Sequence, residues 1–344
     1  MIPFEFFHAR SALGQKTVGV NEIEALRQQL APHRYDLAID LRKHPETRPL
    51  LRASGARFLA GFDYAGQFAW LDVALEWEGD RGLQPKRYHI TDDLLHLVEA
   101  VGTSAGTDRG ALAATTVAAL RDAEPLPKAL TPLFDRPVAC VHPGAGNEMK
   151  QWPEEHFIAL IELLVTLSGV NVVLVGGQDE AQIGGRILSA LARPAAIRSV
   201  IGELSLAGLT GLLSRCAFYV GNDSGPKHIA AAVGIPTVGI HSGTVDPTEW
   251  GPMGPQAVAI ARQMSCSPCY LNRVADCVRG LVCIRQIDPA VVFEACRRVL
   301  DGAGGQPDGS VRKHAAPDRS RKHHAPPDRS RKHKATDSTY SRNE

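Results

Sequence analysis

The sequence has no long apolar segment. None of its stretches approaches the roughly 18 consecutive apolar residues that a membrane-spanning helix needs. Its opening residues, MIPFEFFHARSALGQK, also lack the basic region, apolar run and small-residue cleavage site of a secretory signal peptide. We therefore expect a cytoplasmic protein.

Net charge is also nearly absent, at +1 over 344 residues, but it is unevenly distributed. Lys and Arg outnumber Asp and Glu by ten to five in residues 306–344. Three ten-residue repeats begin there at Pro307, Pro317 and Pro327, and they contain almost no residue able to build a core. We predict a disordered basic tail over 306–344. A solvated appendage is favoured over contact with an anionic membrane, and no specific nucleic-acid partner is expected.

The remaining chain is long enough for two domains, and an apolar fraction of 44% is enough for two cores. Residues 136–300 alternate between short apolar strands, such as PVACVHPG and NVVLVGG, and longer segments with apolar residues at helical spacing. Strands separated by helices of this length indicate a parallel sheet covered on both faces. We predict an α/β domain over 138–300.

The N-terminal part resembles only a fraction of such a domain. YDLAIDLR and SGARFLAGFD predict two strands, and TDDLLHLVEAVG predicts an amphipathic helix that ends at a glycine. We assign residues 1–125 to a first, shortened lobe. The Ala- and Pro-containing segment at 122–137 is the expected linker.

One loop carries more polar chemistry than a turn needs. In GNDSGPKHIAAA, Ser224 can cap the following helix, Gly225 allows close approach of a ligand, and Pro226 fits the first turn. The free amides of a helix N-terminus favour an anion, most naturally a phosphate, and Lys227 and His228 could add donors. The alternative is that Asp223 and Ser224 only cap a helix.

Two further strand ends support the phosphate interpretation. HPGAGNEMKQWP, residues 142–153, contains Gly144 and places Lys150 before another helix that begins with proline. VGGQDE supplies Gly176, although Gly-Gly turns are common. Two such loops on one sheet suggest a diphosphate and a sugar held between them.

In this order and spacing, HPGAGNEMKQWPEEHFIALIELL, VVLVGGQDE and GNDSGPKHIAAAVGIPTVGIHSG resemble the C-terminal domain of glycosyltransferase family 9, the lipopolysaccharide heptosyltransferases. The resemblance runs from about Tyr35 to Leu300. It implies a GT-B fold of two Rossmann-like lobes, here with a shortened N-terminal lobe. The C-terminal lobe would bind a nucleotide diphospho-sugar, typically ADP-heptose, and the enzyme would need no cofactor for its chemistry.

The resemblance also implies roles for individual residues. Lys150 resembles the lysine that meets the donor phosphates, and Asp223 the acidic residue near the donor sugar. The backbone around Ser224, Gly225 and Pro226 resembles the diphosphate site, and His228 matches the family histidine. Positioned amides and cations stabilise the charge that develops on a leaving diphosphate, and a carboxylate base would assist an inverting displacement.

The base is where the sequence departs from the family pattern. Family members open with a strand followed by S-x-x-G-D, whose Asp is the proposed base, but RSALGQ has Gln15 at that place. Asp40, at the end of the LAIDL strand, is the alternative carboxylate, with a structural role favoured over catalysis. We expect that translation begins upstream of Met1, that the base lies elsewhere, or that the enzyme is impaired.

Four of the seven cysteines cluster in CSPCYLNRVADCVRGLVC. Cys266, Cys269, Cys277 and Cys283 could close a tetrahedral structural zinc site. Their spacing does not match the paired C-x-x-C pattern of zinc ribbons, so buried thiols or a redox-dependent disulfide remain the alternatives. The other three, in apolar contexts, are expected in the core: Cys140, Cys216 and Cys296.

The sequence therefore predicts an inverting glycosyltransferase. It would move a sugar, heptose by the resemblance, from a nucleotide diphospho-sugar to a lipopolysaccharide-core or other lipid-linked or glycan acceptor. Its expected place is the inner face of the cytoplasmic membrane, with peripheral membrane contact left open. A nucleotide-sugar-binding protein without transferase activity is the alternative.

Overall fold

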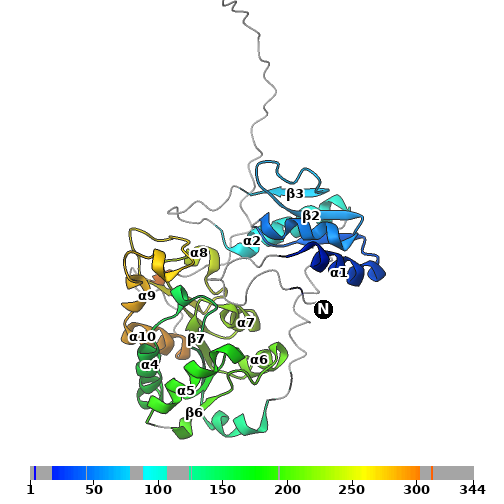
Figure 1. Cartoon of the computed structure of the whole chain (residues 1–344). Coiled ribbons are helices and arrows are strands. Elements are labelled where there is room, and N and C mark those ends of the chain that lie inside the picture. Colours follow the sequence, from blue (N-terminus) through cyan, green and yellow to red (C-terminus); the bar gives the residue numbers. More distant parts are fainter. Residues whose placement is uncertain are drawn as a thin grey trace, which may run out of the picture.

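The computed structural model describes residues 4, 18–43, 45–77, 88–106, 124, 126–192, 194–302 and 311–312. These residues form two α/β lobes (Figure 1), as the sequence predicts. The basic tail and the RSALGQ segment with Gln15 lie outside the described residues, except for Val311–Arg312. No described helix combines the length and the apolar character needed to cross a lipid bilayer.

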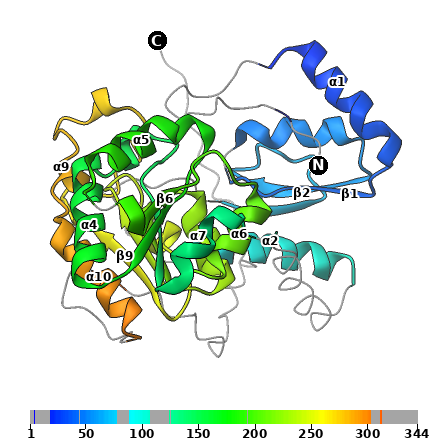
Figure 2. The same ribbon diagram turned by 90° about the horizontal axis from the view of Figure 1, so that it is seen from below.

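The N-terminal lobe contains a parallel sheet with the order β1-β2-β3. Both predicted strands of this lobe are present, and β3 adds a third. The 3-10 helix η3 and the helix α2 cover opposite faces of the sheet, and α1 packs against η3 (Figure 2). The elements are α1 (Val20–Leu30), η2 (Ala31–His33), β1 (Leu37–Asp40), η3 (Pro45–Ser54), β2 (Phe58–Asp63), β3 (Val73–Glu76) and α2 (Ile90–Ser104).

The C-terminal lobe contains a seven-stranded sheet with the order β10-β9-β8-β7-β4-β5-β6. All neighbours are parallel except β10 and β9, which are antiparallel. Its strands are β4 (Val138–His142), β5 (Asn171–Leu174), β6 (Ile197–Ser199), β7 (Phe218–Asn222), β8 (Thr237–His241), β9 (Ala257–Ala261) and β10 (Val311–Arg312).

Helices cover both faces of this sheet, and α4 and α10 lie opposite α6 and α7 (Figure 2). The helices and 3-10 turns are η5 (Lys128–Asp135), η6 (Glu148–Lys150), α4 (Glu154–Leu167), η7 (Gln178–Glu180), α5 (Ala181–Ala190), η8 (Pro194–Ala196), α6 (Leu206–Leu213), α7 (Gly225–Val233), α8 (Pro247–Trp250), η9 (Val274–Asp276), α9 (Val282–Arg285) and α10 (Pro289–Leu300).

The two-residue period of β4 explains why its sequence is apolar throughout. Ala139 and Val141 face the core beneath α4 and α10, whereas Val138 and Cys140 face the core beneath α6 and α7. A strand buried on both faces carries no polar alternation. Chemistry is therefore confined to the loops at the strand ends.

Part of the expected linker belongs to the C-terminal lobe. In η5, Leu130 and Leu133 are buried in the core that also contains Val138. The Leu133 carbonyl also accepts a 2.7 Å hydrogen bond from the side-chain amide of Asn171, at the start of β5. The change from one lobe to the other therefore occurs before residue 128.

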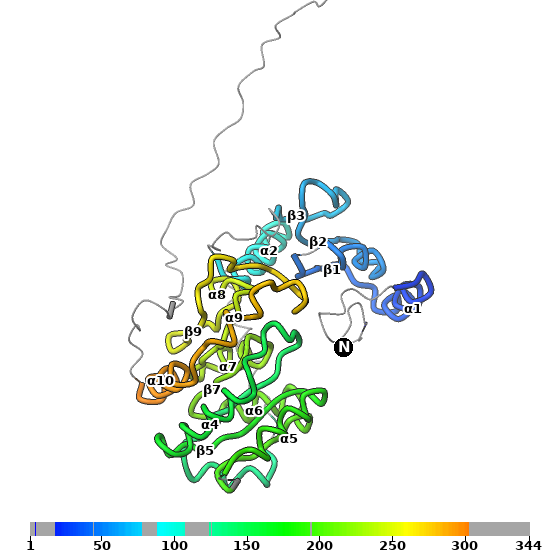
Figure 3. Tube along the Cα trace, turned by 60° about the vertical axis from the view of Figure 1, so that its left-hand side comes forward, coloured from blue at the N-terminus to red at the C-terminus, as the bar shows by residue number. Residues whose placement is uncertain are grey.

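The two lobes meet where the first turn of α2 contacts the segment after α8, and Figure 3 shows α2 and α8 side by side. His89 caps α2 and is buried, and its Nε2 donates a 2.9 Å hydrogen bond to the Gly251 carbonyl. Lys43, in the loop after β1, pairs with Asp93 of α2 and lies 3.6 Å from a carboxylate oxygen of Glu249 in α8. The carboxyl end of β1 therefore faces the C-terminal lobe.

Candidate functional site

The site lies at the point where the C-terminal sheet reverses its direction of growth. From β4 the chain adds β5 and β6 on one side, then returns to add β7, β8 and β9 on the other. The loops after β4 and β7 therefore lie next to each other at the carboxyl edge of the sheet. Open α/β sheets bind ligands at such a position.

Asn222, the last residue of β7, joins these two loops. Its side-chain amide donates a 2.7 Å hydrogen bond to the Pro143 carbonyl, and its Oδ1 accepts a 3.1 Å bond from the Trp152 backbone amide. Trp152 is buried, and its indole N–H donates to the Ile287 carbonyl at 2.9 Å. The loop that carries Lys150 is therefore fixed at both ends, which is why Lys150 can face the next strand.

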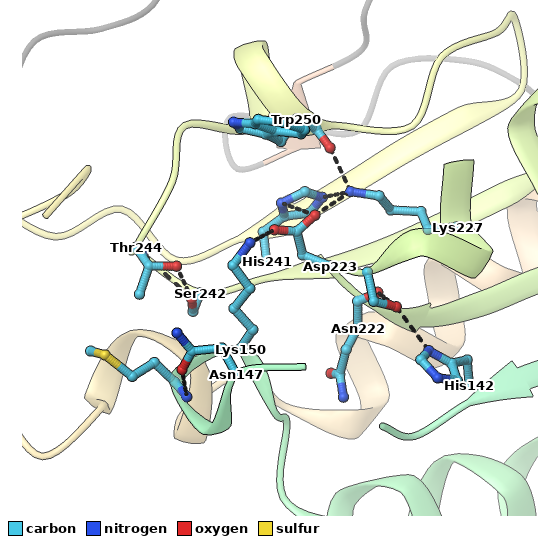
Figure 4. A network of polar contacts seen from close by, with 12 residues as sticks. His142, Asn147, Lys150, Asn222, Asp223, Lys227, His241, Ser242, Thr244 and Trp250 are labelled. Carbon is cyan, nitrogen blue, oxygen red and sulfur yellow. Dashed lines mark hydrogen bonds and ion pairs between the residues drawn. The ribbon is translucent and has the colours of Figure 1, made fainter. Parts of the chain in front are cut away.

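The Asp223 carboxylate lies between two ammonium groups (Figure 4). Lys150 Nζ is 2.7 Å from its Oδ2, and Lys227 Nζ contacts its Oδ1. Asp223 and Lys227 are buried, whereas the Lys150 side chain is 26% exposed. One negative charge between two positive charges leaves an excess positive charge at the mouth of the site, which suits an anionic ligand.

The ionisation of Asp223 follows from these contacts. Burial acts to raise the pKa of the carboxyl group, but the attraction of the Lys227 and Lys150 ammonium groups outweighs burial and holds that pKa well below its usual range. Burial lowers the pKa of Lys227 to about 8, although Asp223 acts in the opposite direction. At neutral pH Asp223 and Lys227 therefore form a charged pair.

Lys227 uses every donor it has within the protein. Besides Asp223, its ammonium group donates to the Trp250 carbonyl and to His241 Nε2 at 3.3 Å. Because a lysine ammonium has three donors and no acceptor, His241 Nε2 must be the unprotonated nitrogen. The ring proton then sits on Nδ1, which lies 3.8 Å from Asp223 Oδ1. Burial keeps the pKa of His241 well below its ordinary value, so the ring is neutral.

Ser224 differs from its expected role. It occupies the N-cap position of α7, but its side chain makes no capping hydrogen bond. Its hydroxyl instead contacts His142 Nδ1 at 2.9 Å, and His142 Nε2 lies 3.0 Å from Glu180 Oε2. The amides in the first turn of α7 are therefore left without a side-chain cap, which keeps them available to a ligand. Pro226 lies in that turn, as expected.

The predicted glycines divide into two kinds. A Cβ atom on Gly225 would meet nothing within 4 Å, so the backbone there is open to an approaching ligand. A Cβ atom on Gly144 would lie 1.8 Å from Glu180 Oε1, and one on Gly176 would lie 2.4 Å from Glu180 Oε2. Gly144 and Gly176 thus make room for the Glu180 side chain, which also accepts a 2.8 Å hydrogen bond from the Gly177 amide.

His228 lies beside the contact between the lobes. Its ring is 6.4 Å from that of His89 and 6.3 Å from that of Trp250, centroid to centroid. Burial and the nearby Lys227 lower the pKa of His228 to about 4, against the attraction of Asp223. The imidazole is therefore neutral and able to donate or accept a hydrogen bond at the mouth of the site.

Asp40 is committed to bonds within the N-terminal lobe. Its carboxylate accepts a 2.7 Å hydrogen bond from the Thr47 hydroxyl and a 2.9 Å bond from the Arg42 amide, and it pairs with Arg48 at 2.5 Å. Arg48 is itself buried and also donates to the Arg42 carbonyl at 2.8 Å. These contacts connect β1 with η3, which is the structural role that the sequence favoured.

The four clustered cysteines line one small cavity of about 70 Å³ behind the loop of Lys150, with Met149 and Met264 among its other walls. All seven cysteines lie within described ranges and are free thiols. Within the described ranges, no group of three or more His, Cys, Asp or Glu side chains is arranged to hold a metal ion. Cys140, Cys216 and Cys296 are buried, which confirms their place in the core.

The sequence patterns did not predict four parts of this candidate site. His142 and His241 end buried strands, and each could have been found as a polar residue at the carboxyl end of a parallel strand. Glu180 and the buried position of Lys227 were harder to find, because an acidic residue in the first turn of a helix, or a lysine there, is usually exposed to solvent. Only the packing of β5, α7 and α8 brings these side chains inward.

Known proteins resemble most of this chain in sequence. The family model described as glycosyltransferase family 9 (heptosyltransferase) matches residues 23–276. Lipooligosaccharide heptosyltransferase 2 of Haemophilus influenzae is 34% identical over 133 residues, which cover 37% of each chain. Lipopolysaccharide heptosyltransferase 1 of Pseudomonas aeruginosa is 27% identical over 277 residues, which cover 78% of this chain and 71% of that protein. The chain matches only about a third of the length of the first relatives found.

Solved structures share the fold at low sequence identity. The ADP-heptose lps heptosyltransferase II of E. coli has a TM-score of 0.58 at 21% identity, covering 86% of both chains. The glycosyl transferase family 9 protein of Veillonella parvula has a TM-score of 0.60 at 17% identity, covering 83% of this chain and 79% of its own. The fold is thus of the two-lobed GT-B type.

Proposed function

The chain belongs to glycosyltransferase family 9, and from this we propose that it transfers a heptose from an ADP-heptose type donor to a glycan of the lipopolysaccharide core. The observation that carries the proposal is the pair Lys150 and Asp223 at the switch point of the C-terminal sheet. Solved structures of the same fold include an E. coli heptosyltransferase with ADP and with ADP-2-deoxy-2-fluoro heptose.

The donor diphosphate would lie between Lys150 and the first turn of α7. The Lys150 side chain is partly exposed, and within the described ranges its ammonium group contacts Asp223 alone. The uncapped amides of α7 and the positive end of its dipole favour the same anion. Gly225 leaves the space that a phosphate group needs.

The reaction would be a direct displacement at the anomeric carbon. A hydroxyl oxygen of the acceptor forms the new glycosidic bond while the bond to the diphosphate oxygen breaks. ADP leaves with the electron pair, and its developing negative charge is stabilised by Lys150 and the amides of α7. The hydroxyl proton passes to a base, and the anomeric configuration inverts. We assign no residue as this base, because Asp40 is already bonded to Thr47 and Arg48.

The commitment of Asp40 to structure favours one second candidate, a nucleotide-sugar-binding protein without transferase activity. The two functions predict the same binding and differ only in turnover. A transfer assay with radiolabelled ADP-heptose and a lipopolysaccharide acceptor that lacks heptose distinguishes the two functions. Label transferred to the acceptor removes the second candidate, whereas tight donor binding without transfer supports it.

Isothermal titration of the full chain with ADP tests the binding half of the proposal. We expect micromolar affinity that falls with increasing salt, since the main contacts are ionic. Lys150→Met should weaken ADP binding at least tenfold, and Lys128→Met, which changes an exposed lysine of η5, should leave it unchanged. Absence of ADP binding by the wild-type chain would remove both candidate functions.

Two further parts of the function stay predictions. A lipid-linked acceptor would bring the protein to a membrane surface, and cosedimentation with acceptor-containing vesicles tests that association. A structural zinc ion would lie among Cys266, Cys269, Cys277 and Cys283, behind the donor loops. Mass spectrometry of the native protein decides the zinc question: one zinc per chain supports it, and a metal-free folded protein contradicts it.

A further inference from the structure

The least expected group in the site is the Lys227 ammonium. Its side chain has no exposed surface, and its three donors are satisfied by Asp223, Trp250 and His241. A lysine with no exposed surface and no unused donor cannot bind the donor phosphates without breaking these contacts. Lys227 therefore differs from Lys150, although both contact the same carboxylate.

This difference matters once a ligand arrives. If Lys150 turns to the donor diphosphate, Asp223 loses its partner at Oδ2 and keeps its partner at Oδ1. A buried carboxylate with no positive neighbour would take up a proton or attract Lys150 back. Lys227 prevents both outcomes, because its position is independent of the ligand.

We propose that Lys227 is a positioning residue that keeps Asp223 as a fixed, negatively charged acceptor for a hydroxyl group of the transferred sugar while Lys150 binds the diphosphate. The proposal rests on the donor-binding function proposed above. Oδ2 is the oxygen that Lys150 vacates, so it is the acceptor offered to the sugar. Lys227 would then govern recognition of the sugar, and Lys150 recognition of the diphosphate.

The same lysine connects the site to the contact between the lobes. Its bond to the Trp250 carbonyl fixes the end of α8, and the next residue, Gly251, accepts the hydrogen bond from His89 of the N-terminal lobe. Asp223, Lys227, the Trp250–Gly251 backbone and His89 thus form one continuous series of contacts. The carboxylate that faces the sugar is thereby placed relative to the lobe expected to bind the acceptor.

The test separates the two lysines by using ADP and ADP-heptose as ligands. Lys227→Met keeps the length and volume of the side chain and removes its charge. We expect this variant to bind ADP within threefold of wild type and to lose at least tenfold of the additional affinity that the heptose provides. Lys150→Met should weaken the binding of both ligands and keep the additional affinity that the heptose provides. Equal loss of ADP affinity in the two variants would overturn the proposal.

A pH profile provides a readout that a purely structural role would not move. The charged and titratable groups that interact with Asp223 are Lys150 before α4, Tyr219 of β7, Lys227 and His228 of α7, and His241 of β8. Without Lys227, protonation of Asp223 should move the acidic limb of kcat/KM for ADP-heptose upward by at least about one pH unit. An unmoved limb in Lys227→Met contradicts the proposal. In a chain without turnover, the pH dependence of ADP-heptose binding serves as the same readout.

A double variant keeps the proposal testable if Lys227→Met folds poorly. Asp223→Asn together with Lys227→Met removes both charges, so no buried carboxylate is left without a partner. We expect the double variant to regain most of the melting temperature that Lys227→Met loses. A double variant as unstable as the single one would show that the lysine acts through packing alone. Wild-type chain that binds no ADP would instead refute the donor-binding function and leave this stability result intact.

Discussion

Lys150 Nζ lies 2.7 Å from Asp223 Oδ2, although the two residues are 73 positions apart in the chain. They meet because β4 and β7 are neighbours in the sheet, and both side chains follow the carboxyl ends of their strands. The parallel sheet thus brings a partly exposed cation to a buried anion at the switch point.

Asp223→Asn should destabilise the protein strongly at neutral pH. The variant leaves the Lys227 ammonium buried without an anionic partner, and breaking a buried pair in this way costs about 3 kcal/mol or more. Urea unfolding at pH 7 measures the loss. Asp36→Asn, at an exposed position before β1, is a control of the same chemistry, and a loss no larger than that of the control would contradict the prediction.

The same comparison should depend on pH in one direction. The pKa of Asp223 is lower in the folded protein than in the unfolded chain, so its stabilisation is present above the unfolded value of about 4 and is lost as pH falls below it. The difference in unfolding free energy between wild type and Asp223→Asn should therefore shrink below about pH 4. A constant difference from pH 7 to pH 3 would show that the ion pair is not its source.

Much of this arrangement follows from the sequence, for reasons that particular residues make clear. The strands at 138–142 and 218–222 are recognisable because their residues are apolar on both faces, which only a covered parallel sheet allows. The loops after them are recognisable from glycine, proline and polar residues. The rule that ligands bind where strand ends converge then places Lys150 and Asp223 at one edge of the sheet, although their direct contact was not predicted.

Other features depended on packing that sequence patterns do not encode. Ser224 is a strong N-cap residue by type, yet its hydroxyl bonds to His142 because β4 brings that ring within 2.9 Å. Lys227 occupies a helix turn where lysine is normally solvated, but the α8 segment covers it. In both cases a contact between elements distant in sequence overrides a local preference.

His228 should make stability decrease between about pH 6.5 and pH 4. Burial lowers its pKa to about 4 in the folded protein, whereas the unfolded chain takes up a proton near pH 6.5. Over that range the unfolded state binds more protons, so folding loses up to about 3 kcal/mol as pH falls. His228→Gln should lack this part of the pH dependence. Thermal unfolding of both proteins at half-unit pH steps provides the measurement, and parallel curves would contradict it.

His89→Ala should affect turnover more than donor binding. The substitution removes the 2.9 Å hydrogen bond to the Gly251 carbonyl, through which the N-terminal lobe contacts the α8 segment. All proposed contacts to ADP come from the C-terminal lobe, so the Kd for ADP should stay within twofold of wild type. We expect kcat to fall about tenfold, because misplaced reactants lose near-attack geometry. Loss of ADP affinity together with kcat would instead show that His89 supports the donor site.

Gly144→Ala should damage the site, whereas Gly146→Ala should be nearly silent. A Cβ atom at 144 would lie 1.8 Å from Glu180 Oε1, so the Glu180 side chain must leave and lose its bonds to His142 and to the Gly177 amide. Burial acts to raise the pKa of Glu180, but the hydrogen bonds from His142 and the Gly177 amide outweigh burial and lower that pKa, so the displaced group is a carboxylate. Losing hydrogen bonds to a charged group costs roughly 1.5–3 kcal/mol. A Cβ atom at 146 meets nothing within 4 Å. Melting temperatures and ADP titrations of the two variants make the comparison, in which similar behaviour would mean that Glu180 does not require the space at Gly144.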